Sequence, residues 1–166
     1  ALESHRKASE AISQGRFDKE TVAFRIPSKK GDLEFKVDEG VRADTTMEAL
    51  AKLRPAFKEG GVVTAGNSSQ LSDGAAALVV ASRRFAEERG LEPLAAIEGY
   101  HTGGVEPKHI MEAPIPTTRE LLRKLDLDIM DVDLFEHNEA FATASVAVRR
   151  ELQVPEGRFN VNGGAI

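Results

Sequence analysis

The feature that most restricts the fold of this chain is an uninterrupted apolar run at residues 75–82, AAALVVAS. Such a run, preceded by polar turn residues, predicts a strand that is buried on both faces. Further strands are expected at 94–98, 132–136 and 159–161, with helical patterns between them. Alternation of strands and helices from residue 74 onward is typical of an α/β protein with a largely buried sheet.

The first part of the chain has a different texture. Residues 1–72 combine an expected hairpin, with strands at 21–26 and 33–37, with long loops. Helical spacing of apolar residues, together with capping residues, predicts helices at 1–14, 47–53, 82–90, 117–125 and 138–152. Residues 1–72 therefore look like a loop-rich region attached to an α/β region.

Composition excludes several classes of protein. The chain has 166 residues, of which 41% are hydrophobic, and a net charge of -5, which argues against a basic nucleic-acid binder. Cysteine is absent, so these residues hold no disulfide, no thiolate metal site and no cysteine nucleophile. No apolar run approaches the roughly 18–20 residues that span a bilayer, and the N-terminus has no signal-peptide core. We expect a cytoplasmic protein without a membrane or nucleic-acid partner.

The segment 66–77, GNSSQLSDGAAA, is the first candidate for a binding site. Small residues allow the backbone to approach a ligand closely, and Ser68, Ser69 and Ser72 offer hydroxyl groups. A tight turn without any ligand would use the same residues. From composition alone, the turn is the better interpretation.

The segment 137–142, HNEAFA, is the second candidate, because it links an expected strand to an expected helix. Sites in α/β sheets lie at such junctions, and Asn138 could orient a water or donate to a developing enolate oxygen. Plain helix capping by Asn138 explains the same residue, since Asn is a preferred cap. The Gly-Gly turn in 160–166, NVNGGAI, indicates crowded or flexible backbone and no more.

Histidines and charged clusters give weaker signals. His5, His101, His109 and His137 form neither an i,i+4 pair nor an HExxH motif, so no metal site is expected. Only His137 lies beside a candidate site, and its sequence neighbours include no partner that assigns it a direct role. The DExxR pattern at 38–42 is most often a surface ion-pair cluster.

The order of these segments is much more specific than any one of them. The chain resembles the thiolase family from about Ser4 to Ile166, through this series: DExxR, LAKLRPAF, TAGNSSQLSDGAAA, a Met-containing Pro-x-Pro loop, NEAFA and NVNGGAI. The resemblance implies an acyl-CoA acyltransferase that cleaves 3-ketoacyl-CoA with CoA, or condenses acyl-CoA units in reverse, through an acyl-cysteine. No covalently bound cofactor is implied, with CoA and acyl-CoA as substrates, and homodimers or homotetramers are usual in the family.

The implied fold is the layered αβαβα thiolase fold, of which this chain would be a fragment. Residues 1–72 would belong to the CoA-binding loop domain. Residues 73–93 would supply the last strand and helix of the N-terminal half, and 94–166 would begin the C-terminal half.

The resemblance also assigns roles to residues. Asn138 would be catalytic, holding the water of the oxyanion hole that polarises the thioester carbonyl. The positions that match the substrate and CoA contacts of the family are Arg42, Leu53, Phe57, Ala65, Ser69, Met111, Ala140 and Phe141. Arg42 would lie near the nucleotide end, Ser69 at the pantetheine arm and Met111 by the acyl group.

Some family features are missing from these residues. The acyl-accepting cysteine, the histidine of a GHP motif and the second cysteine all lie outside the matched stretch, so we expect the chain alone to be inactive. The loop at Met111 is shorter than in the family and lacks its glycines, and His137 replaces a residue that is commonly small or aliphatic.

Two alternatives stay open. One is a thiolase-like protein that binds acyl-CoA or lipid without turnover, and the other is an assembly subunit that serves a catalytic partner. The presence of NEAFA favours catalysis. Acyl chain length, the direction of the reaction and the oligomeric state do not follow from the sequence.

Overall fold

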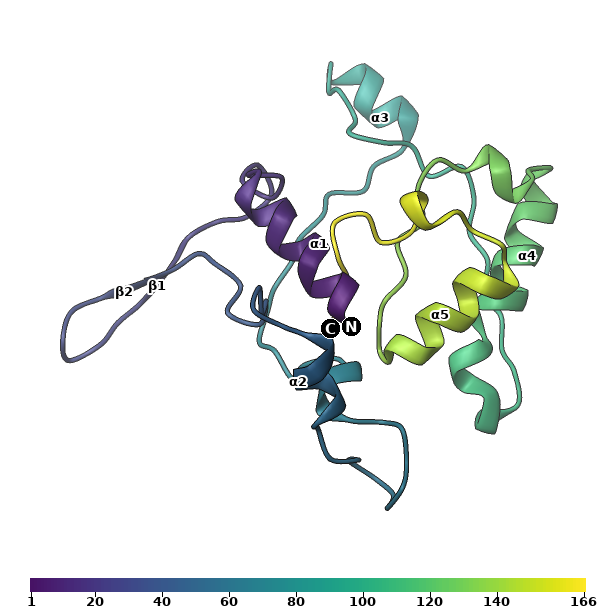
Figure 1. Ribbon diagram of the computed structural model, residues 1–166. Helices are drawn as coiled ribbons and strands as arrows, with labels where there is room; N and C mark the ends of the chain where they lie inside the picture. Colours follow the sequence, from purple (N-terminus) through teal and green to yellow (C-terminus); the bar gives the residue numbers. More distant parts are fainter. The chain divides into compact units, whose positions relative to one another are not determined.

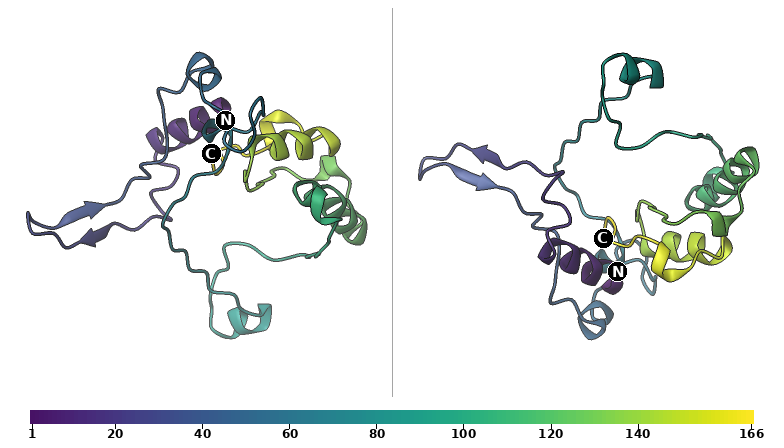
Figure 2. Two further views of the ribbon diagram at one scale, coloured as in Figure 1. Left: turned by 90° about the horizontal axis from the view of Figure 1, so that it is seen from below. Right: turned by 90° about the horizontal axis from the view of Figure 1, so that it is seen from above.

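The computed structural model describes residues 1–166, which fall into two compact units. Unit 1 comprises residues 1–70 and 129–166, and unit 2 comprises residues 71–128. Both chain termini belong to unit 1 and lie side by side (Figures 1 and 2). Unit 1 is thus assembled from two stretches that are distant in sequence. The two units are defined by packing within this chain and do not test the three-part division at residues 72 and 93. That division remains a prediction.

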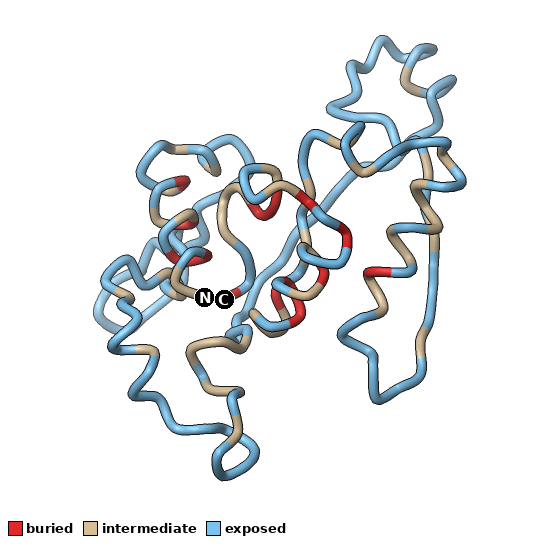
Figure 3. Tube along the Cα trace, turned by 45° about the vertical axis from the view of Figure 1, so that its right-hand side comes forward, coloured by how far each residue is buried: buried red, intermediate tan, exposed pale blue.

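Unit 1 has its core around two helices, α1 (Leu2–Ser13) and α5 (Ala142–Glu151). Each buries small apolar residues at helical spacing, Ala8 and Ala11 in α1 and Ala144 and Val148 in α5, so each has one apolar face. Figure 3 shows that most of the buried residues are in these helices and in the segment that leads to the C-terminus. The other buried apolar residues of unit 1 are Leu152, Val154, Phe159 and Ile166.

The predicted hairpin is confirmed, although its strands are shorter than expected. β1 (Phe24–Ile26) pairs antiparallel with β2 (Leu33–Phe35), and Phe24 stands opposite Phe35 across the ladder. Gly31 adopts a φ of 110° in the connecting turn, a conformation that favours glycine. All six strand residues are exposed, so the hairpin extends from unit 1 as a two-stranded ribbon (Figure 2).

The short helix α2 (Met47–Ala51) and α3 (Arg83–Glu88) both begin as their sequences predict. The Thr46 hydroxyl accepts a hydrogen bond from the Ala49 N–H, and the Ser82 hydroxyl accepts one from the Phe85 N–H. These side chains satisfy backbone donors that have no partner inside the helix.

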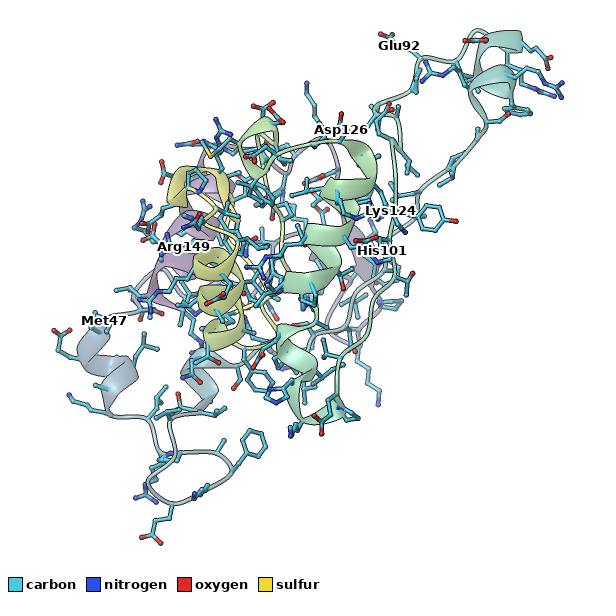
Figure 4. All side chains as sticks on the ribbon, turned by 90° about the vertical axis from the view of Figure 1, so that its right-hand side faces the viewer. Met47, Glu92, His101, Lys124, Asp126 and Arg149 are labelled. Carbon is cyan, nitrogen blue, oxygen red and sulfur yellow. The ribbon has the colours of Figure 1, made fainter.

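In unit 2, α4 (Pro114–Leu125) begins three residues before the predicted start at Thr117. Proline is accepted in the first helical turn because its missing N–H would have no partner there. Asp126 ends the helix with a φ of 55°. The Lys124 Nζ lies 2.9 Å from the His101 Nδ1, which ties the end of α4 to the loop before it (Figure 4).

The expected strands at 75–82 and 94–98 are wrong. Neither segment forms a strand, and Val79 and Leu94 are 98% and 103% exposed. A strand needs a neighbour to pair its backbone groups, and neither segment has a strand partner in this chain. The expected strands at 132–136 and 159–161 are reduced to isolated parallel bridges, one between Phe135 and Phe159 and one between Val161 and Gly163.

Candidate functional site

The GNSSQ loop lies against the residues that follow Asn138. The Ser69 N–H donates to the Ala140 carbonyl at 3.0 Å, and Ser68 forms an antiparallel bridge with Phe141. These contacts join the two candidate segments, which are distant in sequence but both belong to unit 1. The structure therefore brings Ser69, Ala140 and Phe141 together, and their individual roles remain predictions.

Inside the loop, two polar side chains serve the turn itself. The Asn67 amide accepts from the Thr64 N–H at 2.8 Å and donates to the Val62 carbonyl at 2.9 Å. The Ser68 hydroxyl donates to the Thr64 carbonyl at 2.8 Å. The turn interpretation is therefore right for Asn67 and Ser68. Ser69 is exposed, and only its backbone is engaged in these contacts.

The expected apolar wall lies beside this loop. Leu53 packs closely over Gly66, where an added Cβ would stand 2.5 Å from the Leu53 Cδ1. Ala65 opens the same short 3₁₀ helix, Ala65–Asn67. Phe57 is 79% exposed, so its ring has no packing partner that covers it within the chain. The structure groups Leu53 with Ala65 and leaves Phe57 at the exposed edge.

The DExxR segment is tied to both α1 and the GNSSQ loop. The Arg42 N–H donates to the His5 Nδ1 at 3.3 Å, and the Gln70 amide donates to the Gly40 carbonyl at 3.0 Å. Asp38 accepts from the Gly40 N–H at 2.7 Å, so its carboxylate stabilises a turn. The ion-pair interpretation is therefore wrong for Asp38. Arg42 itself is exposed.

An open pocket of about 510 Å³ lies between α1 and the residues that follow Arg42. Its lining includes His5, whose imidazole is buried and whose pKa is lowered, first by that burial and then by nearby positive charges that include Arg42. A neutral imidazole is the form that can accept the Arg42 N–H at Nδ1. Asn138 does not line this pocket.

Asn138 does not cap a helix. α5 begins at Ala142 with Phe141 as its N-cap, so the expected helical start at residue 138 is wrong. Asn138 instead opens a tight turn, in which its carbonyl accepts from the Ala140 N–H at 2.9 Å. Its side chain is exposed. The electric field at the N-terminus of a helix falls off within one turn, and Asn138 lies before the first turn of α5. Any stabilisation of a negative charge by Asn138 must therefore come from the dipole of its own side-chain amide.

Asn160 holds the chain directly before Asn138. Its side-chain oxygen accepts from the His137 N–H at 2.7 Å, and its side-chain nitrogen donates to the His137 carbonyl at 3.0 Å. Its own N–H donates to the Phe135 carbonyl at 2.8 Å. Asn160 is 3% exposed and has a φ of 45°, a conformation that Asn tolerates better than most residues. Sequence reasoning missed this residue, although it stands in the NVNGGAI segment.

Glu139 and Ser4 hold the chain directly after Asn138. The Ser4 hydroxyl donates to the buried Glu139 carboxylate at 2.6 Å and accepts from the Gly164 N–H at 2.8 Å. Ser4 thus joins α1, the NEAFA segment and the Gly-Gly turn. Gly163 is needed there, because it has a φ of 90° and an added Cβ would stand 2.8 Å from the Ala8 Cβ. The crowded-backbone interpretation of NVNGGAI is confirmed.

Met111 is the one predicted site residue that belongs to unit 2. It lies in the 3₁₀ helix Pro107–Glu112 and is 41% exposed. The structure therefore does not group it with the others. No cluster of three or more His, Asp or Glu side chains is arranged to hold a metal ion. No helix has the length and apolar character required to cross a membrane.

Comparison with solved structures shows the fold. The crystal structure of the Bacillus anthracis acetyl-CoA acetyltransferase superposes on 98% of this chain with a TM-score of 0.94 and 46% identity, and the match covers 41% of that protein. The crystal structure of human mitochondrial 3-ketoacyl-CoA thiolase in complex with CoA superposes on 99% of the chain, with a TM-score of 0.90 and 41% identity, and 40% of that chain is covered. The layered thiolase fold expected from the sequence is thereby confirmed.

Sequence relatives and family domains agree with these structures. A Staphylococcus epidermidis protein described as a "Probable acetyl-CoA acyltransferase" is 47% identical over the whole chain, which spans 42% of that relative's length. Residues 1–84 match the N-terminal thiolase domain, and residues 91–166 match the C-terminal thiolase domain. With both family domains matched in order, and with the fold of solved thiolases over nearly all of its length, this chain belongs to the thiolase family.

Proposed function

We propose that this chain is part of an enzyme that transfers acyl groups between 3-ketoacyl-CoA and CoA through an acyl-cysteine, either in thiolysis or in Claisen condensation. The chain spans about 42% of its matched relatives, and its 166 residues contain no cysteine. The nucleophile, the activating histidine and the second cysteine of such an enzyme would come from other residues. The 166-residue chain alone would be inactive.

One observation carries this proposal: the hydrogen bond from the Ser69 N–H to the Ala140 carbonyl, beside the Ser68–Phe141 bridge. It sets the loop expected to contact pantetheine against the segment that contains Asn138. Acyl transfer requires this proximity, because the thioester that reacts is attached to the end of the pantetheine arm. A scaffold protein has no such requirement.

Asn138 would act by electrostatic stabilisation. A fixed amide that holds a water near the thioester carbonyl favours the negative charge that develops on the oxygen in the transition state. Two features support this role. The side chain of Asn138 is exposed, and the residues on either side of it are held by Asn160 and Ser4. Little reorganisation is then needed when the charge develops.

The expected substrate is an acyl-CoA, and no covalently bound cofactor is proposed. An exposed Arg42 suits a phosphate, and exposed Leu53 and Phe57 suit the apolar parts of CoA. A solved relative has CoA bound. We further propose that the whole protein forms a homodimer or homotetramer in the cytoplasm. No nucleic-acid or membrane partner is proposed.

The test is a steady-state thiolysis assay with a 3-ketoacyl-CoA and CoA, on a full-length protein that contains these 166 residues. Asn138→Ala should lower kcat by about 10²–10³, the usual cost of one oxyanion-hole donor. Ser69→Ala should instead raise the KM for CoA more than it lowers kcat. Thr143→Ala, on the exposed face of α5, is the matched control and should match the unmodified protein.

The same assay separates the proposal from its alternatives. An unmodified protein that binds acyl-CoA without turnover would be a thiolase-like binding protein, and the catalytic proposal would be wrong. A protein that neither binds nor turns over acyl-CoA would support an assembly role. An Asn138→Ala variant with unchanged kcat would remove Asn138 from the mechanism.

A further inference from the structure

His137 stands next to Asn138, and both its backbone and its half-buried imidazole make contacts with other parts of unit 1. Its Nδ1 lies 2.8 Å from the hydroxyl of Ser145 in α5, and its ring stacks on Phe159 with centroids 6.0 Å apart. Its backbone N–H and carbonyl are both bonded to the Asn160 side chain. No other residue of the HNEAFA segment, 137–142, has hydrogen bonds from both its backbone and its side chain to other parts of the chain.

The partner, Ser145, depends on this imidazole. Ser145 is 4% exposed, and its hydroxyl bonds to His137 rather than to the helix backbone. A buried hydroxyl that loses its partner costs the full desolvation penalty of that group. The His137–Ser145 pair is therefore the one side-chain hydrogen bond that fixes the residue before Asn138 to the rigid helix after it.

Burial favours the neutral form of this imidazole. Burial lowers the pKa of His137, and the charged group that opposes this effect is Glu139, which belongs to the same segment. The ring itself contacts the neutral Ser145 and the apolar Phe159, and the neutral Asn160 bonds to the backbone of His137. A neutral imidazole holds its hydrogen bond without placing a positive charge beside Asn138.

We propose that the His137–Ser145 hydrogen bond makes His137 a positioning residue, which sets the direction of the Asn138 amide relative to α5. The inference rests on the proposed function, because it assigns a second residue to the same oxyanion site. His137 does not touch substrate in this proposal and acts only through Asn138. Most of the other backbone contacts of the segment would survive its loss, so the expected defect lies in geometry rather than in folding.

The experiment uses a full-length protein that contains this chain, with kcat expressed per acylated site so that misfolded protein is not counted. His137→Leu has similar volume but no hydrogen bond, and should lower kcat about 3- to 10-fold with an unchanged KM, the size expected for one lost hydrogen bond. Ser145→Ala should give the same loss, and the double variant should lose no more than either single one. His137→Asn, which places an amide nitrogen near the Nδ1 position, should restore most of kcat.

A combination with Asn138→Ala separates positioning from a merely structural role. If His137 acts through Asn138, His137→Leu should change kcat no further in the Asn138→Ala background. A further loss of the full 3- to 10-fold there would overturn the proposal.

Hydrogen exchange gives a readout that does not depend on turnover. The amides of residues 137–140 should exchange faster in His137→Leu and Ser145→Ala, and at the original rate in His137→Asn. If the unmodified protein has no thiolase activity, the proposed function fails, while these exchange rates still decide whether the bond fixes the segment. Unchanged exchange in His137→Leu would overturn the inference.

Discussion

Residues 137–139 and residues 75–81 contrast sharply. The first segment has neither helix nor strand, yet side chains from α1, α5 and the C-terminal segment hold it through short hydrogen bonds. The second has the strongest strand pattern in the chain, yet it is exposed throughout and has no strand partner. Order in this chain therefore follows the availability of partners more than the strength of the local pattern.

An apolar sequence pattern shows that a segment needs strand partners and burial. A hydrogen-bond network supplies the partners that keep a segment in place. The crystal structure of the Bacillus anthracis acetyl-CoA acetyltransferase superposes on 98% of the chain. That protein is more than twice as long as the matched stretch, which is 41% of its length. We expect the strand-like segment to find its partners only in a chain of that size.

The largest expected effect concerns Val79, in the segment 75–81 that has no strand partner. In the isolated 166-residue chain, Val79→Lys should leave stability unchanged, because this side chain is 98% exposed. In a full-length protein the same change should prevent soluble folding, because a strand buried on both faces would enclose an unpaired charge. Soluble yield and thermal midpoint measure both cases, with the exposed Glu92→Lys as the control. Equal tolerance in the two proteins would contradict the buried-strand expectation.

The next effect concerns Asn160, whose side chain holds the segment 137–139 through two hydrogen bonds. Asn160→Gly accepts the φ of 45° without strain but removes both bonds to His137, so it isolates the side-chain contribution. We expect the free energy of unfolding to fall by about 1–3 kcal/mol, because the His137 N–H and carbonyl lose their partners in a half-buried place. Chemical denaturation of a full-length protein measures this. If the free energy of unfolding falls no more than in an exposed substitution such as Thr143→Ala, water replaces the two Asn160–His137 hydrogen bonds.

A smaller effect tests the apolar wall at Gly66. In Gly66→Ala the new Cβ would meet the ends of Leu50 and Leu53, at 2.6 Å and 2.5 Å. Both are flexible side-chain ends, so we expect a modest cost of about 1 kcal/mol and a raised KM for CoA with little change in kcat. Gly74→Ala, which meets nothing within 4 Å, is the matched control. If both variants bind CoA equally well, the wall does not contact it.

The smallest effect is the pH dependence of stability. Burial lowers the pKa of His5 and His137 from 6.5, so the unfolded chain binds protons more readily than the folded one as the pH falls. The free energy of unfolding should then decrease below pH 6.5. The charge of Arg42 lowers the pKa of His5 further, whereas Asp44 and Glu139 raise it. Glu139 also opposes the lowering of the His137 pKa.

Denaturation at about pH 7.5 and about pH 5.5 measures this dependence above the carboxylate range. Burial raises the pKa of Glu136 from 4.5, which has the opposite sign and acts mainly at lower pH. His137→Asn should reduce the decrease between the two pH values. An identical decrease in this variant would assign the effect to His5 alone.

Much of the regular structure could be predicted from local patterns. Helices α1, α2 and α3, the caps at Thr46 and Ser82 and the hairpin all follow from spacing, capping residues and turn residues within a few positions of each other. The start of α5 could not be predicted this way. Asn138 is a good capping residue, but the bonds from Asn160 and Ser4 hold its segment in another conformation.

The candidate site divides in the same manner. Asn138, Ser69 and Arg42 were predicted because the order of the motifs resembles one family; membership of that family is confirmed, and the roles of these residues stay predictions. Asn160, Ser4 and Ser145 were missed because each acts through side-chain hydrogen bonds to residues between 8 and 160 positions away, and such contacts leave no periodic signal in the sequence.

The sequence by itself determined the family, the helices whose signals are local and the residue types that the chemistry requires. Only the tertiary structure decided which loops meet, that Ser69 bonds to Ala140, and that Asn138 lies in a turn fixed from both sides. The physical reason is one of range. Helix spacing and caps act over three or four residues, whereas the hydrogen bonds that orient the site join residues up to 160 positions apart, and folding alone brings these together.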